Sequence, residues 1–133
     1  MIVGIDIDDT ITACVPLFRI LTKSVKDAGG EVHIISSRSD TPEVLRATKD
    51  ELDCLKISYD YIFLLPDRVV AEKVCLHREL DWYQKFIWQK VQYCKDKKVS
   101  LYFDDEGKVI ELFQKYAPEI QLLRVIKNSK GED

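Results

Sequence analysis

Short apolar runs alternate along the chain with longer segments of helical periodicity. Residues 1–5 are apolar, and apolar side chains recur at helical spacing over residues 14–26, after which Gly29 and Gly30 end the helix. A second apolar run, residues 31–35, again predicts a strand. Strand, helix and strand in this order are typical of a parallel crossover unit.

The same alternation continues to the end of the chain. Thr41 and Pro42 have the residue types of a helix start, and apolar positions after them predict a second helix. The pattern therefore predicts an α/β fold, a Rossmann-like parallel sheet of about five strands with helices on both faces and its first strand in the centre. The remaining elements are expected as strands at 59–65, 99–103 and 120–126, a loop at 66–77, helices at 80–97 and 107–116, and a fraying polar tail at 127–133.

The helix at 80–97 has the clearest pattern. Its apolar positions recur at helical spacing, so we expect its aromatic side chains in the core rather than on a binding surface. The residues concerned include Trp82 and Phe86.

Composition narrows the class of protein. A length of 133 residues suits one domain over 1–133, and a net charge of −3 excludes a chain that binds nucleic acid by overall charge. The longest apolar runs are far shorter than the ~20 residues of a membrane span, and the start lacks the features of a signal peptide. Four cysteines without CxxC spacing are typical of reduced thiols, so we expect a cytoplasmic protein without membrane contact.

Polar residues gather where the apolar strands end. Asp6 and Asp8 follow the first strand, Ser36 follows the second, and Asp104 and Asp105 follow the fourth. Carboxyl ends of parallel strands meet at one edge of a sheet, where α/β proteins bind ligands. Carboxylates at the end of a buried strand are costly unless they bind a cation or take part in chemistry. The alternative is a polar loop that caps a helix, with Thr10 or Thr12 as the cap.

These strand ends resemble the motifs of the haloacid dehalogenase-like (HAD) phosphohydrolase superfamily. The first motif stands as Asp6-Ile7-Asp8-Asp9-Thr10, in which Asp9 replaces the usual glycine. Ser36 matches the second motif, Lys85 near the start of a helix is taken as the third, and the pair Asp104-Asp105 is the fourth. The segments between the motifs are too short for a folded cap domain, so the resemblance implies the capless type with an open site.

The resemblance implies a role for each matched residue. Asp6 would attack phosphorus and bind Mg²⁺, and Asp8 would be the general acid and base, with its carbonyl on the metal. Thr10 would hold the loop that aims Asp8, and Ser36 and Lys85 would bind phosphoryl oxygens. Asp104 and Asp105 would complete the metal site, with the direct ligand of the two left open.

A closer similarity concerns the substrate. The order and spacing of Asp81, Lys85 and the later acidic pair resemble the phosphatase domain of phage-type polynucleotide kinase/phosphatase, as does the run Ser36-Ser37-Arg38. Ser37, Arg38 and Asp81 are accordingly candidates for substrate contacts. If the third motif lies elsewhere, Lys73 is the next candidate.

The resulting hypothesis is a Mg²⁺-dependent phosphatase with an aspartyl-phosphate intermediate and a phosphorylated substrate, such as a nucleic-acid end or another large molecule. A phosphoprotein, nucleotide or sugar phosphate would suit the same chemistry. A HAD-like binding module without turnover is a different class, which the paired Asp6 and Asp8 disfavour. A receiver-like signalling domain would carry its acidic pair early, whereas here the adjacent acids come late. The oligomeric state stays open.

Overall fold

The computed structural model describes residues 1–126 and contains one five-stranded, all-parallel sheet of order β3-β2-β1-β4-β5. The predicted α/β class and the central position of the first strand are both confirmed. The strands are β1 (Ile2–Ile5), β2 (Glu31–Ser39), β3 (Tyr61–Leu65), β4 (Leu101–Asp104) and β5 (Gln121–Arg124). The helices are α1 (Val15–Asp27), α2 (Pro42–Cys54), α3 (Arg68–Val74), α4 (Trp82–Asp96) and α5 (Gly107–Tyr116), with a 3₁₀ turn at Ile11–Ala13.

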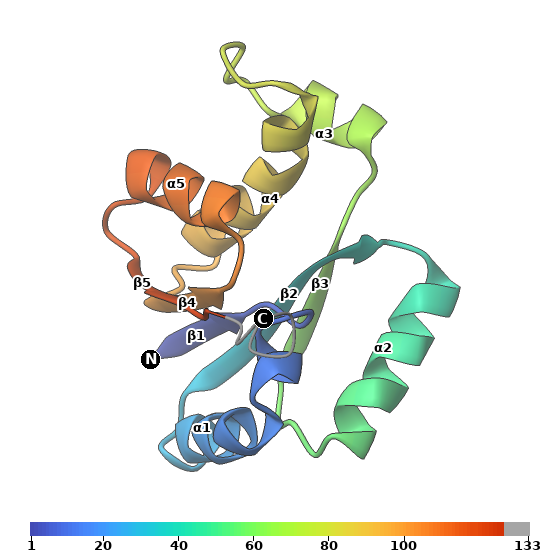
Figure 1. Ribbon diagram of the computed structural model, residues 1–133, viewed down its shortest axis with the longest axis vertical. Coiled ribbons are helices and arrows are strands. Elements are labelled where there is room, and N and C mark those ends of the chain that lie inside the picture. Colours follow the sequence, from blue (N-terminus) through green and yellow to red (C-terminus); the bar gives the residue numbers. More distant parts are fainter. Residues whose placement is uncertain (127–133) are drawn as a thin grey trace, which may run out of the picture.

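Helices cover both faces of the sheet. Figure 1 shows α1 and α2 on one side and α4 and α5 on the other, with α3 beside the start of α4. On the α1 side, Phe18 and Leu52 pack with Val3, Ile5 and other buried strand residues. Alternate residues of each strand face opposite sides, so one strand supplies both cores.

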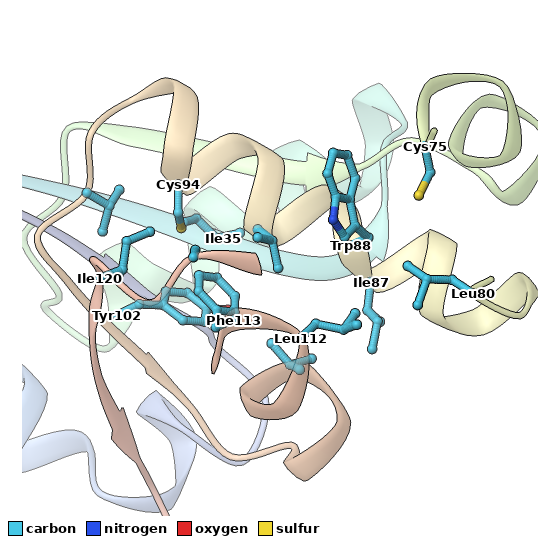
Figure 2. Close-up of a cluster of buried hydrophobic side chains, with 14 residues drawn as sticks. Ile35, Cys75, Leu80, Ile87, Trp88, Cys94, Tyr102, Leu112, Phe113 and Ile120 are labelled. Carbon is cyan, nitrogen blue, oxygen red and sulfur yellow. The ribbon is translucent and has the colours of Figure 1, made fainter. Parts of the chain in front are cut away.

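The core on the other face joins α4 and α5 to the sheet. Figure 2 shows its side chains, among which Ile87 and Cys94 come from α4 and Phe113 comes from α5. Tyr102 of β4 lies stacked on Phe113 with ring centroids 4.5 Å apart. A Cβ atom on Gly4 would lie 2.9 Å from the Tyr102 ring, so a glycine at this position lets the ring lie against β1.

Several boundaries differ from the sequence prediction. The segment 66–77, expected as a loop, contains α3, in which the Val70 amide is capped by the Asp67 carboxylate. β2 runs beyond residue 35 to Ser39, with an irregularity in its pairing to β3 after Ser36. The expected tail 127–133 lies outside the described residues. Among residues 1–126, no helix is long and apolar enough to cross a bilayer.

Candidate functional site

Parallel pairing brings the ends of β1 and β4 together. Ile5 lies opposite Phe103, so the next residues, Asp6 and Asp104, are neighbours at the carboxyl edge of the sheet. The amide of Asp6 donates to the Phe103 carbonyl at 3.0 Å, which fixes the backbone where the strand ends. Both carboxylates are buried, at 6% and 1% exposure.

One buried lysine balances these carboxylates. Nζ of Lys90 lies 3.1 Å from Asp6 Oδ1 and 2.9 Å from Asp104 Oδ2, and its side chain is only 2% exposed. Burial would lower the pKa of Lys90, but the two carboxylates outweigh it and raise the pKa above its usual value. The ammonium is therefore charged at neutral pH.

Lys90 corrects the prediction that Lys85 serves this role. Five helical residues separate the two, which turns their side chains roughly 140° apart around α4. Among residues 1–126, no hydrogen bond or ion pair involves the Lys85 side chain. The alternative candidate, Lys73, is exposed on α3. A sequence signal for Lys90 exists, because it falls within the apolar positions Ile87, Val91 and Cys94, where a lysine is unexpected.

A third carboxylate belongs to the same cluster. Oxygen atoms of Asp6, Asp104 and Asp105 all lie within 4.8 Å of one another. The hydroxyl of Thr10 lies 3.0 Å from Asp6 Oδ2 and 3.2 Å from Asp105 Oδ1, and its single proton can go to either. Thr10 therefore links the carboxylates that follow β1 and β4, and it belongs to the loop that precedes α1.

Asp104 is held more fully than Asp105. Its Oδ2 accepts from Lys90 and from the Tyr102 hydroxyl, and its Oδ1 accepts from the Glu106 amide at 3.0 Å. The sequence does not predict the contact of Tyr102 with Asp104, because a tyrosine in a strand does not indicate which side chain its hydroxyl contacts. Asp105 is half-buried, and within residues 1–126 its carboxylate accepts only from Thr10, so it is the freer carboxylate of the two.

Burial sets the protonation of Asp6. Desolvation is the largest influence and raises the pKa of Asp6 to about 7, while Lys90 opposes that rise and Asp104 adds to it. Three carboxylates facing one ammonium leave an excess of negative charge, which a cation or a proton can neutralise. The site is thus suited to a metal ion by its charge as well as by its oxygen donors.

The Asp8 carboxylate, in the turn after β1, is exposed and is not part of this cluster. Asp9 has φ 61°, a left-handed conformation that glycine favours and aspartate tolerates better than most residues. Its amide donates to Thr12 Oγ1 at 2.9 Å. The replacement of the usual motif glycine is thereby accommodated, and Asp8 is exposed at the mouth of the site.

Arg38 holds the exposed Asp8 carboxylate. Its Nε and Nη2 donate to the two oxygens of Asp8 at 3.1 and 2.9 Å, a fork-like contact that lowers the pKa of Asp8. Nη1 donates to Glu51 at 2.7 Å and to Thr48 at 3.1 Å, which anchors the guanidinium on α2. The predicted substrate contact is therefore occupied by protein partners in this structure.

The other two predicted substrate contacts differ from each other. Ser37 is exposed, whereas the neighbouring Ser36, predicted to bind phosphoryl oxygens, is buried within β2 and its hydroxyl accepts from the Arg38 amide at 3.1 Å. Asp81 is the N-cap of α4: its carboxylate accepts from the Gln84 amide at 2.7 Å, and the Gln84 side chain accepts from the Asp81 amide. A capping box accounts for this aspartate without a substrate.

Comparison with known proteins shows similarity in fold. No family model and no curated protein sequence matches the chain. A chain in the solved structure of the Pnkp1/Rnl/Hen1 complex has TM-score 0.63 and 14% identity, covering 96% of this chain and 45% of that one. A structure of the Pnkp1/Rnl/Hen1 RNA repair complex gives TM-score 0.64, 15% identity, and 96% and 43% coverage. This chain thus spans less than half the length of the chains it resembles.

Proposed function

We propose that the protein is a Mg²⁺-dependent phosphatase that hydrolyses phosphate monoesters at nucleic-acid ends through an aspartyl-phosphate. The observation that carries this proposal is the cluster of Asp6, Asp104 and Asp105 around one buried ammonium, that of Lys90. Such a concentration of charge at the carboxyl edge of a sheet is destabilising unless it serves binding or catalysis.

The donor set fits a hard divalent cation. All three side chains offer carboxylate oxygens, which suit Mg²⁺ and not the softer metals that prefer sulfur or imidazole. Asp6 and Asp105 are the stronger candidates for direct ligands, because Asp104 already accepts three hydrogen bonds. The Asp8 carbonyl stays a predicted ligand. When bound, Mg²⁺ would screen the repulsion between a carboxylate nucleophile and the phosphoryl group.

Asp6 is the proposed nucleophile. One of its carboxylate oxygens forms a bond to phosphorus as the bond from phosphorus to the leaving oxygen breaks, which yields an aspartyl-phosphate and an alkoxide. Lys90 holds Asp6 Oδ1, which orients the carboxylate and keeps the charge balanced. Water then attacks phosphorus, releases phosphate and restores the Asp6 carboxylate.

Asp8 is the proposed acid and base, and Arg38 controls when it can act. The lowered pKa of Asp8 keeps it ionised, which suits the removal of a proton from water but not its donation to an alkoxide. An incoming phosphoryl group offers Arg38 a competing anion. We infer that substrate binding loosens the contact between Arg38 and Asp8, so that Asp8 carries a proton when the leaving group needs it.

Two observations support a nucleic-acid end as the substrate. The folds similar to this chain occur in an RNA repair complex, although this likeness alone establishes only the fold. In addition, single helices α1 and α2 follow β1 and β2, so no folded unit inserted there covers the site within residues 1–126. A large phosphorylated substrate can approach an open site of this kind.

A phosphatase screen tests the proposal. The substrates are oligonucleotides phosphorylated at the 3′ or the 5′ end, nucleotides, sugar phosphates and phosphopeptides, each with Mg²⁺ and with EDTA. We expect release of phosphate from oligonucleotides and its loss in EDTA. Preference for a phosphopeptide or sugar phosphate would keep the chemistry and change the substrate. If the protein binds one of these compounds but hydrolyses none of them, it is a binding module and the proposed enzyme is rejected.

The covalent intermediate separates the two aspartates. With an activated aryl phosphate, Asp8→Asn should still transfer phosphate to Asp6, because a good leaving group needs little protonation, and the intermediate should accumulate. Asp6→Asn should form none. Mass spectrometry of the quenched reaction identifies the modified residue. Phosphate on Asp8, or none on Asp6 under any condition, would reverse or reject the assignment.

A further inference from the structure

A groove of about 560 Å³ opens at the same edge of the sheet as the carboxylate cluster. It lies between the ends of β2 and β3 and the starts of α3 and α4, and its apolar lining consists of Leu65, Pro66, Val70, Trp82 and Phe86. This volume is within the range of about 300–1,000 Å³ that is typical of small-molecule sites.

The groove adjoins the proposed reaction site at two points. On β2, it begins at Ser39, directly after Arg38, which holds Asp8. On α4, Phe86 lies one turn before Lys90, about 6 Å along the helix axis, and Trp82 lies one turn further. A substrate whose phosphate lies at Asp6 can therefore extend along the start of α4 into the groove.

Trp82 differs from what its place in an amphipathic helix predicts. The sequence pattern places it in the core, yet its side chain is 52% exposed. The guanidinium of Arg68 lies 5.1 Å from the centre of its ring. Next to it, Tyr83 packs edge-on against Trp82, and the Lys108 ammonium lies 5.5 Å from the Tyr83 ring. Two aromatic rings, each close to a cation, thus stand at the start of α4.

The charges of the groove select the kind of group it can take. Asp40 and Asp67 line it together with Arg68, so it offers no excess of positive charge to a phosphate. The Asp67 carboxylate is engaged by the Val70 amide, at 3.1 Å. An exposed indole, a phenyl ring and a proline instead suit a flat, uncharged ring that can stack.

We propose that this groove binds a nucleobase of the strand whose terminal phosphate lies at Asp6, with the base stacked on Trp82; this inference rests on the proposed function. Arg68 beside Trp82 is also paired with Glu72, at 3.5 Å, so Lys108 beside Tyr83 is the cation better placed to attract the backbone of the strand. Stacking tolerates any base, so the groove selects single-stranded ends without reading their sequence. The net charge of −3 does not oppose this, because base stacking needs no positive charge and Lys108 lies beside the start of α4.

Binding of a fluorescent probe tests the stacking directly. The probe is a labelled single-stranded oligonucleotide with a terminal phosphate at its 3′ or 5′ end, measured by anisotropy in EDTA so that it is not hydrolysed. A second probe lacks the bases of its terminal nucleosides. Trp82→Ala should weaken binding of the first probe roughly 5- to 100-fold and leave the second unchanged.

Three further variants control for folding and position. Trp82→Phe keeps a ring and should retain most of the affinity, whereas Trp82→Gln should behave like Trp82→Ala. Tyr61→Ala removes a similarly exposed aromatic residue from the start of β3, at the opposite edge of the sheet, and should bind both probes like wild type. Thermal melting of each variant shows that it is folded.

The outcomes separate this inference from the proposed function. The groove assignment is overturned if the wild-type protein binds both probes equally or binds neither. It is also overturned if Trp82→Ala loses affinity for both probes to the same extent. If the protein is a phosphatase but Trp82→Ala does not weaken binding of the probe with bases, the groove assignment is rejected and the proposed enzyme is retained. If Trp82→Ala weakens binding of that probe alone and the protein has no phosphatase activity, the groove is retained and the enzyme is rejected. If a phosphotyrosine peptide, measured as a third probe, is the only one whose binding Trp82→Ala weakens, the groove takes a peptide and our proposal is wrong.

Discussion

At the scale of single residues, the site depends on Lys90. Its ammonium contacts both Asp6 and Asp104, and each contact stabilises a carboxylate that burial would otherwise penalise. Without this lysine, buried carboxylates would face one another with no counterion. The same charge also lies next to the atom proposed to attack phosphorus, so stability and catalysis should depend on it together.

Lys90→Met keeps much of the volume of the side chain and removes its charge. We expect the free energy of unfolding to fall by about 3–5 kcal/mol, as for the loss of one partner of a buried ion pair. In protein that remains folded, kcat/KM should fall at least ~100-fold, since a strong electrostatic donor is lost. Urea denaturation and steady-state kinetics measure the two effects.

Lys85→Met is the matched control on the same helix. Lys85 is half-buried and has no side-chain ion pair within residues 1–126, so both quantities should stay close to wild type. A large loss of activity in Lys85→Met alongside a mild effect of Lys90→Met would restore the original assignment of the third motif.

Arg38 gives a second prediction at this scale. Its contact lowers the pKa of Asp8, so Arg38→Gln should raise that pKa toward the ordinary value or above it. Asp8 then stays protonated to higher pH. For alkyl phosphates, the basic limb of the plot of kcat against pH should therefore shift to higher pH. An activated aryl phosphate, which needs little protonation, is the control. Equal shifts with both substrates would show that Arg38 acts through something other than Asp8.

At the scale of elements, the sequence predicted the residues at the strand ends but not which face of α4 packs against the sheet. A strand followed by acids indicates a site, because parallel pairing carries the residues after Ile5 and Phe103 to the same edge. Choosing between Lys85 and Lys90 requires knowing which face of α4 meets the sheet. The apolar positions of α4 contain that information, because Lys90 lies among the buried residues Ile87, Val91 and Cys94, whereas motif spacing does not.

Short elements were harder still to predict. α3 has seven residues, too few for its apolar periodicity to stand out from that of a loop. The exposure of Trp82 depends on where the first turn of α4 leaves the sheet, which the sequence of α4 alone does not contain. The groove beside Trp82 could therefore not be predicted, although the helical pattern of α4 includes both of its aromatic residues.

Asp81 gives a prediction about α4 itself. As the N-cap of a capping box, Asp81→Ala should lower the free energy of unfolding by about 1 kcal/mol, because the first amides of the helix lose an acceptor. Its kcat/KM should stay within about twofold of wild type, as expected for a surface change that leaves the reacting groups in place. A large rise in KM in Asp81→Ala would instead support the predicted substrate contact.

At the scale of the whole molecule, the fold keeps three carboxylates together at the expense of its stability. The pKa of Asp6 is about 7 in the folded chain and near 3.8 in an unfolded one. Between these values the folded state retains a proton that the unfolded state has lost. The stability that comes from this proton is fully present below pH 3.8 and is lost as the pH rises through about 7. A bound cation would replace the proton and restore the loss.

The melting temperature should therefore respond to Mg²⁺ in a pH-dependent way. In EDTA, we expect the protein to melt at a lower temperature at pH 8 than at pH 6, since the folded state has lost the proton on Asp6. Added MgCl₂ should raise the melting temperature by several degrees at pH 8 and much less at pH 6, where metal and proton compete for the same oxygens. Asp6→Asn cannot lose a proton, so its melting temperature should depend less on pH and respond weakly to Mg²⁺. Differential scanning fluorimetry measures all four conditions without any substrate. An equal effect of Mg²⁺ on both proteins at both pH values would place the bound metal somewhere other than the cluster of Asp6, Asp104 and Asp105.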